Sequence, residues 1–333
     1  MYRVHFIPEK NIYEVEDSSE IIPYSPALNV IEEYPPERFQ MHVLYNSRDD
    51  YGENSIFQVY VVPEKKRIGW IFPGQALLSN QHDYANDQYF LKYVYVSLYR
   101  ILEDVGDIDE KEIAEKTFLV IDNENIDGVK DFNINDYIVS LYSYGYSFSG
   151  RGNLYSSIDT VQDKHLHLKP ISKGLNEKKT YIQYLFREHI PQSVNPVSSF
   201  LFFYQIIEIL ISIVFDEIFR DLLKEIEEGV DVDLMQKKEK LIESVSEKQR
   251  IRRLFSNKVS VERSSLTLLG EACDHILDRY GQDKGDTDED KLYSLRCMLI
   301  HRCYILDTES VNLINDVNDA FSAVVSEMLM SFK

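Results

Sequence analysis

The sequence is poor in the residues that cross-link or interrupt a fold: it has three cysteines, 10 prolines and 13 glycines in 333 residues. The cysteines, Cys273, Cys297 and Cys303, form no CxxC pair, and their odd number argues against a disulfide framework. A reducing cytoplasm fits this pattern best. The N-terminus also lacks a basic segment followed by an apolar run, so we expect no secretory signal.

Basic residues are outnumbered by acidic ones, 36 to 56, which gives a formal net charge of −20. A protein that coats nucleic acid relies on clustered Lys and Arg, so this balance weighs against general coating. It leaves room for an enzyme that admits RNA at one local basic patch. With 44% hydrophobic and 28% charged residues the chain can bury a sizeable core, and its length suggests two domains.

The two halves of the chain differ in pattern. Residues 1–175 predict a mixed α/β domain, a possible sensor or regulatory part, with strands at MHVLY from Met41, SIFQVYVV from Ser55 and TFLVID from Thr117. Apolar spacing predicts a helix over 86–106 between them. Residues 176–197 predict a connecting helix, TYIQYLFREH, and a proline-flanked linker.

From residue 198 to 333 strand signals vanish, and five helices are expected, near 198–228, 233–255, 260–280, 288–304 and 310–332. Short connections between most of them predict an antiparallel helical bundle. The first helix contains SSFLFFYQIIEILISIVF, the one run that could pass for a membrane span. Gln205 and Glu208 fall in its middle, where a carboxylate is costly in lipid, so we expect a buried helix and no membrane contact.

The fourth expected helix reads KLYSLRCMLIHRCYIL and carries Arg296 and His301 with four residues between them. This Arg-x4-His pattern, in the penultimate helix of a C-terminal bundle, resembles the HEPN superfamily. The bundle opens with FLFFYQIIEIL, which is similar to the first helix of several HEPN subfamilies, including Tyr204, Gln205 and Glu208. The fold class that follows is α+β, with an N-terminal mixed α/β domain and a C-terminal HEPN-like antiparallel bundle.

The resemblance implies a metal-independent endoribonuclease with no cofactor, acting on RNA as a homodimer in a toxin, stress or anti-phage defence system. In such proteins the other domain commonly senses a trigger or restrains the nuclease, and a separate triggering or neutralising partner can exist. His301 would act as base or acid for attack by the 2′-hydroxyl of RNA, and Arg296 would stabilise charge on the phosphate. The products would carry a 2′,3′-cyclic phosphate and a 5′-hydroxyl.

Five residues at about 100° each place Arg296 and His301 roughly 140° apart around a helix, so they flank a groove and do not share a face. Members of the family usually solve this by dimerising, so that two Arg–His pairs line one cleft, and the resemblance therefore implies a homodimer. Glu208 is expected to orient Arg296, and Arg302 to add a phosphate contact. Cys297 occupies a position at which active members commonly have Asn, His or Asp.

The densest basic stretch, KQRIRRLFSNK, is a candidate RNA-binding segment. Its cations are Lys248, Arg250, Arg252, Arg253 and Lys258. The alternative for this stretch is solvated charge at a helix end. Arg296 could equally be a surface arginine that answers the acidic loop before it, His301 a core or cap histidine, and Glu208 a structural ion-pair partner.

Two other functions stay open: a non-catalytic HEPN module that dimerises and binds a partner protein or nucleotide, and an activity located in the N-terminal domain.

Two further patterns resemble metal sites only weakly. His165 and His167 alternate on one strand face but lack a third metal ligand at matching spacing. The acidic loop GQDKGDTDED has Lys291 where a calcium loop needs glycine, so capping by Thr287 with Asp290 three residues on is expected.

Overall fold

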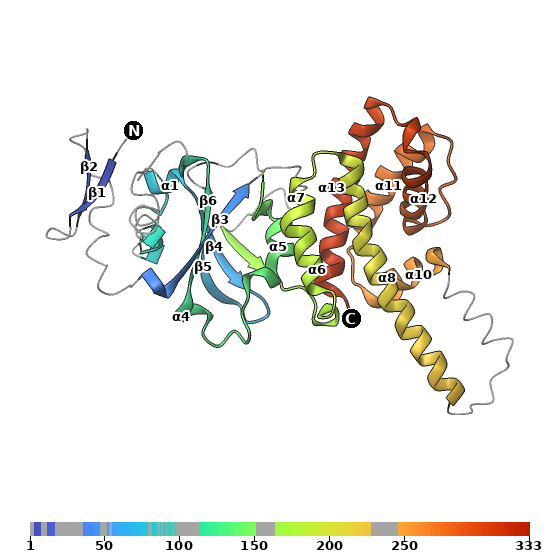
Figure 1. Cartoon of the computed structure of the whole chain (residues 1–333), viewed down its shortest axis with the longest axis horizontal. Coiled ribbons are helices and arrows are strands. Elements are labelled where there is room, and N and C mark those ends of the chain that lie inside the picture. The colour runs from blue at the N-terminus through green and yellow to red at the C-terminus, as the bar shows by residue number, and fades with distance from the viewer. Residues whose placement is uncertain are drawn as a thin grey trace. The chain divides into compact units, whose positions relative to one another are not determined.

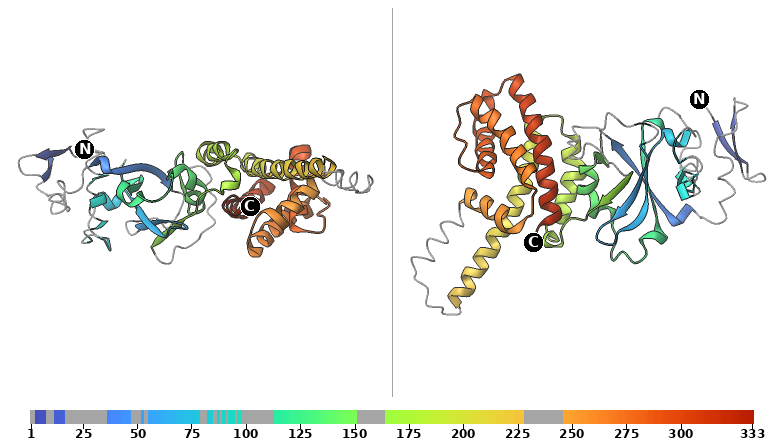
Figure 2. Two further views of the ribbon diagram at one scale, coloured as in Figure 1. Left: turned by 90° about the horizontal axis from the view of Figure 1, so that it is seen from below. Right: turned by 180° about the vertical axis from the view of Figure 1, so that it is seen from behind.

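The computed structural model describes residues 3–7, 12–16, 36–46, 52, 55–78, 82–84, 87, 89–90, 92–94, 96–97, 113–150, 164–227 and 246–333. The chain forms two compact units (Figures 1 and 2). The first contains the strands of the described part of the chain. The second is helical and takes in Ile138–Ser143 as well as Ile171–Lys333, so the units do not follow a single cut in the sequence.

The first unit is built on a curled six-stranded sheet with the order β7-β3-β6-β5-β4-β8 (Figure 1). Its strands are β3 (Phe39–Asn46), β4 (Phe57–Val61), β5 (Lys66–Pro73), β6 (Thr117–Asp122), β7 (Tyr146–Ser147) and β8 (His165–Leu168). Every pairing is antiparallel except that of β4 with β8, which is parallel. The central strand β6 is buried at all six residues, which fits its unbroken apolar run TFLVID.

Short elements accompany this sheet. They are a separate antiparallel ladder of β1 (Arg3–Ile7) and β2 (Ile12–Glu16), the helices α1 (Gln75–Leu78) and α4 (Asn123–Ile126), and the 3-10 turns η2 (Pro36–Arg38) and η3 (Ile134–Tyr137). The predicted strands at Met41, Ser55 and Thr117 are confirmed as β3, β4 and β6. Of the helix predicted over 86–106, residues 89–90, 92–94 and 96–97 are helical, and its predicted end at Gly106 lies outside the described residues.

A buried ion cluster holds the end of β6. The carboxylate of Asp122 is fully buried and accepts two hydrogen bonds from Arg38, each 2.7 Å, and one of 3.0 Å from Lys92. It also accepts from the backbone N–H of Glu124 and so caps α4. Burial alone would raise the pKa of Asp122, but the two cations lower it below its ordinary value. The cluster ties η2, β6 and the segment around Lys92 together.

Where it is described, the helical unit contains five longer helices and several shorter helices and turns (Figure 2). The longer helices are α8 (Pro196–Glu227), α10 (Glu247–Arg253), α11 (Arg263–Arg279), α12 (Asp288–Arg302) and α13 (Thr308–Ser331). The shorter elements are α5 (Ile138–Ser143), η4 (Lys173–Leu175), α6 (Lys179–Tyr184), η5 (Leu185–His189), α7 (Ile190–Gln192), η6 (Leu254–Lys258) and η7 (Cys303–Ile305).

Four of the five helices expected from the sequence are confirmed with ends within a few residues. The helix expected over 233–255 is present as α10 where it is described, and residues 228–245 lie outside the described residues. The connecting helix is also confirmed, as α6, η5 and α7, with the break at residues 193–195 before Pro196.

Helix α8 packs against α13 through an aromatic core. The rings of Phe200 and Phe203 lie 5.4 and 5.7 Å from that of Phe321, and all three are fully buried. Asn318, also buried, donates 2.9 Å to the carbonyl of Pro196 and so fixes the start of α8. Within the described part of the chain, α8 is the one helix long and apolar enough to cross a membrane, and half of its most apolar window is buried inside the protein. This matches the expected core helix.

The Asp122 cluster gives a test of the sheet unit. Asp122→Ala leaves the buried Lys92 and Arg38 without their shared carboxylate, so we expect a loss of about 3–5 kcal/mol in the free energy of unfolding. Glu124→Ala is the matched control, because this carboxylate also pairs with Arg38, at 2.9 Å, but is 68% exposed; its loss should cost less than about 1 kcal/mol. Urea unfolding followed by the fluorescence of Trp70 measures both, and equal effects would contradict the buried cluster.

Candidate functional site

The helix that carries Arg296 and His301 begins at a well-defined cap. Thr287 is its N-cap, and its hydroxyl accepts 3.3 Å from the backbone N–H of Asp290, as the sequence predicts. The carboxylate of Asp290 is itself 1% exposed and receives Arg252 at 3.0 and 2.5 Å and Lys248 at 3.2 Å. The start of α12 is thereby anchored to α10.

The electrostatics of Asp290 follow from these contacts. Burial raises the pKa of Asp290, but the hydrogen bonds from Arg252 and from the backbone N–H of Asp286 outweigh it and lower the pKa to about 2. Asp290 therefore stays ionised at neutral pH, and both cations of α10 keep a partner.

Arg296 lies in the middle of α12 and faces α8 and α10. Its Nη2 atom lies 3.1 Å from Oε1 of Glu208 on α8, and its Nη1 atom 3.8 Å from Oε2 of Glu247 on α10. Its guanidinium carbon is 5.4 Å from the centre of the Tyr204 ring. The side chain is 19% exposed. The contact expected between Glu208 and Arg296 is thus present within one chain. The carboxylates that pair with Arg296 belong to α8 and α10 and not to the acidic loop before α12.

The cluster also contains groups that the sequence did not single out. Glu247 accepts 2.9 Å from the hydroxyl of Tyr204 and joins that residue to Arg296. Burial raises the pKa of Tyr204 first, and the neighbouring Glu247 raises it further, so the hydroxyl stays a neutral donor. Burial would lower the pKa of Arg296, but Glu208 and Glu247 raise it above its ordinary value. One N–H of the guanidinium, at Nε, is buried without a hydrogen-bond partner among the described residues.

Cys297 takes part in this network. Its thiol, one turn after Tyr293 on α12, is the main cause of the raised pKa of Tyr293. It also contributes to the raised pKa of Arg296. The position at which Asn, His or Asp is common is thus held by a weaker hydrogen-bonding group.

His301 and Arg302 lie apart from that network, in the last turn of α12, and both are exposed. Arg302 makes one long hydrogen bond, 3.5 Å from Nη1 to Oε1 of Gln282. The alternative of a core histidine at position 301 is therefore wrong. The structure brings Arg296, Glu208 and Cys297 together and leaves His301 and Arg302 outside this network, open to solvent.

Most of the five cations of the predicted RNA-binding segment form contacts within the helical unit. Lys248 and Arg252 bind Asp290, as described above, and Lys258 forms a short ion pair with Glu217. The guanidinium of Arg250 lies 5.7 Å from the ring centre of Phe215, and Arg253 is half-buried on α10. RNA would have to compete with these contacts, because three of the five cations are ion-paired, two of them with the same carboxylate.

Among the described residues, no group of three or more His, Cys, Asp or Glu side chains is placed to hold a metal ion. His165 and His167 lie on edge strand β8, where their rings flank Tyr60 with centroid distances of 5.2 and 5.4 Å. This is aromatic packing on a sheet face.

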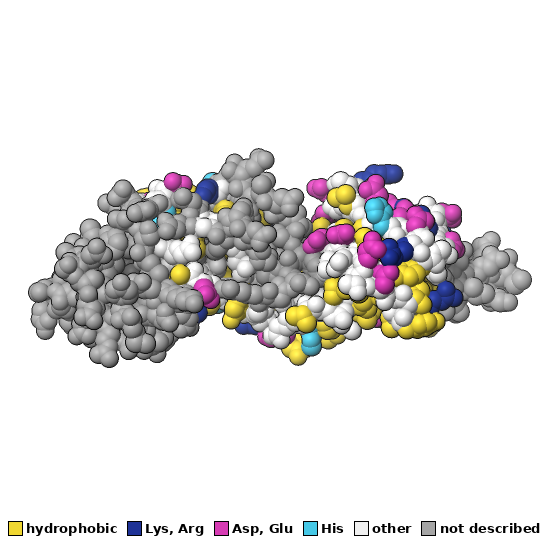
Figure 3. Space-filling view, turned by 90° about the horizontal axis from the view of Figure 1, so that it is seen from above, with side chains coloured by type: hydrophobic (Ala, Val, Ile, Leu, Met, Phe, Trp, Pro, Cys, Tyr) yellow, Lys and Arg dark blue, Asp and Glu magenta, His cyan; other side chains and the backbone are white. Residues whose placement is uncertain are grey.

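Hydrophobic side chains form a band along one edge of the helical unit (Figure 3). The large exposed hydrophobic residues described in the segment from α6 to α8 are Tyr181, Tyr184, Val194, Phe219 and Leu223. Phe219 and Leu223, each 43% exposed, continue the open side of α8 beyond the part that packs on α13. An open apolar stripe on a helix is a surface suited to another protein chain.

No family model, no curated protein and no solved structure matches this chain. The assignment of a function therefore rests on the residues and their geometry.

The Asp290 anchor predicts a pH dependence. Because the pKa of about 2 in the fold is below the ordinary 3.8, the stabilisation is present above about pH 4 and is lost as pH falls from there toward 2. Asp290→Asn should therefore cost about 2 kcal/mol of unfolding free energy at neutral pH. The difference from wild type should shrink below about pH 4.

The measurement is urea unfolding across pH, followed by circular dichroism of the helices. Asp286→Asn is the control, since Asp286 is exposed and only its backbone N–H reaches Asp290. A gap between wild type and Asp290→Asn that stays constant down to pH 3 would show that the charge of Asp290 is not what holds α10.

Proposed function

We propose that this protein is a cytoplasmic, metal-independent endoribonuclease of the HEPN type, acting as a homodimer in a toxin, stress or anti-phage defence role. The observation that carries the proposal is the setting of Arg296. Its guanidinium is held in place by Glu208, Glu247 and Tyr204 and keeps one N–H without a partner among the described residues. A pre-oriented cation of this kind suits a phosphate on which negative charge develops.

The chemistry needs only the RNA and these side chains. The 2′-oxygen attacks the adjacent phosphorus, and its proton passes to the imidazole of His301. The bond from phosphorus to the 5′-oxygen breaks, and that oxygen takes up a proton from an imidazolium or from water. The products are a 2′,3′-cyclic phosphate and a 5′-hydroxyl. Arg296 neutralises charge on the non-bridging oxygens throughout, with Arg302 as a second phosphate contact.

Glu208 is a positioning residue in this scheme. Its side chain is 46% exposed, whereas that of Glu247 is 22% exposed. A phosphate can displace the more exposed carboxylate while Glu247 and Tyr204 keep the guanidinium aimed. Exchange of one anion for another costs less than binding to an arginine that must first be ordered.

Dimerisation is part of the proposal because of the angle between the two motif residues. Roughly 140° of helix rotation separates Arg296 from His301, so one copy does not direct both at the same phosphate. The open apolar stripe of α8, with Phe219 and Leu223, is the surface we assign to the second copy. The sheet unit would then sense a trigger or restrain the nuclease, and a neutralising partner fits the same scheme.

One observation favours a second candidate function. An arginine paired with carboxylates of two other helices also serves as a structural link between them, with no role in catalysis. This supports a non-catalytic HEPN module that dimerises and binds a partner protein or a nucleotide. The two candidates differ in whether RNA is cut.

Substitution at the two motif residues tests the nuclease. On induction in bacteria, the wild type should arrest growth and cleave RNA, whereas His301→Ala and Arg296→Ala should each lower cleavage by roughly 10²-fold or more. His275→Ala and Arg263→Ala are the matched controls, because both side chains are exposed on α11 and should leave cleavage unchanged. A chelator should not slow the reaction, and the RNA ends should accept 5′-phosphate without prior dephosphorylation. Cleavage that persists in both motif variants would remove the site.

Mixing tests the shared cleft. Arg296→Ala and His301→Ala proteins, each inactive alone, should regain cleavage when combined, since one mixed cleft keeps an arginine from one subunit and a histidine from the other. Phe219→Asp should place a charge on the open stripe of α8 and convert the dimer to a monomer in sedimentation velocity. A mixture that stays inactive while mixed dimers form would rule out a cleft built from both subunits.

A further inference from the structure

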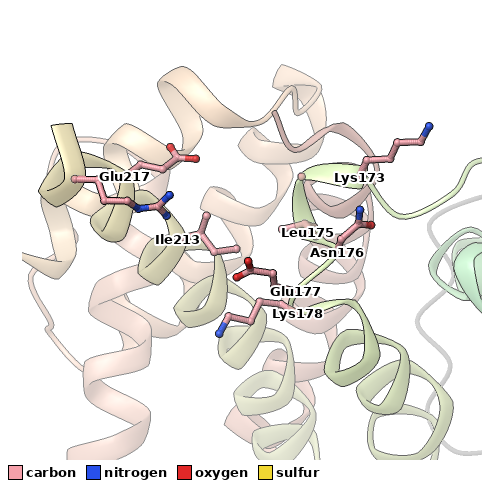
Figure 4. A pocket seen from close by; sticks show the side chains of 9 residues that line it. Lys173, Leu175, Asn176, Glu177, Lys178, Ile213 and Glu217 are labelled. Carbon is pink, nitrogen blue, oxygen red and sulfur yellow. The ribbon is translucent and has the colours of Figure 1, made fainter. Parts of the chain in front are cut away.

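A pocket of about 340 Å³ lies in the helical unit, between η4 with the residues that follow it and the middle of α8 (Figure 4). Its lining is Lys173, Gly174, Leu175, Asn176, Glu177, Lys178, Ile213, Glu217 and Arg220. None of these residues belongs to the Arg296 network. The volume is at the lower end of the range for ligand sites and fits one nucleotide.

Two cations of this pocket are free to bind an anion. Lys178 and Arg220 have no acidic partner among the described residues. Arg220 uses only Nε, which donates 3.2 Å to the carbonyl of Asp216, so its two terminal nitrogens remain available. Glu217 is already neutralised by its ion pair with Lys258. The amine of Lys173 points away from the other labelled side chains (Figure 4).

The rest of the pocket combines an apolar surface with two polar groups. Leu175 is buried beneath the pocket at 1% exposed, and the half-buried Ile213 offers the accessible apolar contact. The carboxylate of Glu177 lies at the centre of the pocket, turned toward Ile213, and the amide of Asn176 stands to one side (Figure 4). A carboxylate accepts from an exocyclic amine of a base, and an amide both donates and accepts.

We propose that this pocket is a subsite for one nucleotide of an RNA strand, with the phosphate on Lys178 and Arg220. The base lies against Ile213 and offers an exocyclic amine to Glu177. The inference rests on the proposed function, because it assigns the RNA of that reaction. Cytosine carries such an amine and uracil does not, so the subsite prefers cytosine to uracil.

Helix α8 relates the subsite to the cleavage site. From Glu208 to Arg220 is twelve residues, which is about 18 Å along the axis and about 120° around it. A strand of several nucleotides reaches from one to the other, whereas a dinucleotide bound at Arg296 does not. The two sites are therefore separable by substrate length. Lys178 and Arg220 of the subsite have no acidic partner among the described residues. In the segment from Lys248 to Lys258, by contrast, three cations are in ion pairs.

The test uses the full chain with His301→Ala, so that RNA stays intact, and fluorescence anisotropy with labelled oligocytidine or oligouridine of about a dozen nucleotides. Lys178→Gln or Arg220→Gln should each weaken oligocytidine binding about fivefold and reduce the salt dependence by about 0.7 in log–log slope. Arg263→Gln, the same loss of charge at an exposed site on α11, should leave binding within about twofold. Glu177→Gln should abolish the preference for oligocytidine over oligouridine.

Two results would overturn the subsite. One is that the pocket variants bind oligocytidine as tightly as the His301→Ala protein does. The other is that Arg263→Gln weakens binding as much as the pocket variants do. Free cytidine monophosphate competing as well as the oligonucleotide would assign the pocket to a free nucleotide instead and overturn the RNA assignment. Cleavage of a dinucleotide by otherwise wild-type protein is read separately. It should be unchanged by Arg263→Gln, and its absence with the binding pattern intact would refute the nuclease alone.

Discussion

The helical unit depends on the meeting of three helices at the guanidinium of Arg296. Withdrawing this cation from water is costly, and the cost is offset only where carboxylates and hydrogen bonds replace the solvent. Glu208 from α8 and Glu247 from α10 provide the charge, while the Tyr204 ring covers the guanidinium and its hydroxyl binds Glu247. Each of these side chains is satisfied only if α8, α10 and α12 pack in this one arrangement.

Asp290 adds a second fixed point to α12, at its first turn. The helix is thus held at its start by Lys248 and Arg252 and in its middle by Glu208 and Glu247, whereas its last turn, with His301 and Arg302, is exposed. A fixed Arg296 and an exposed His301 suit the proposed reaction. The arginine has to be held in place, and the histidine has to reach a substrate that arrives from solvent.

The sequence predicts what is local and misses what is distant. The starts of α8 and α12 follow from Pro196 and the Thr287 cap, because those signals act over one turn. Strand β5 escaped prediction, since the part from Ile68 to Pro73 is buried and shows no alternation. Glu247 gave no signal, because its partners Tyr204 and Arg296 are 43 and 49 residues away. For the same reason the basic segment from Lys248 to Lys258 looked free in the sequence but is largely ion-paired in the fold.

This last point constrains how an acidic chain with a net charge of −20 can hold RNA. Its long-range field repels the substrate, so affinity must come from cations at close range that no carboxylate has claimed. In the described part of the helical unit, the exposed Arg302, and Lys178 with Arg220, meet that condition better than the dense basic segment, whereas Arg296 is ion-paired with Glu208 and Glu247. The number of cations in a sequence overstates the positive charge available to a ligand. The cations that are already ion-paired with carboxylates have to be subtracted first. For this protein, that subtraction moves the expected RNA contacts from α10 to α12 and α8.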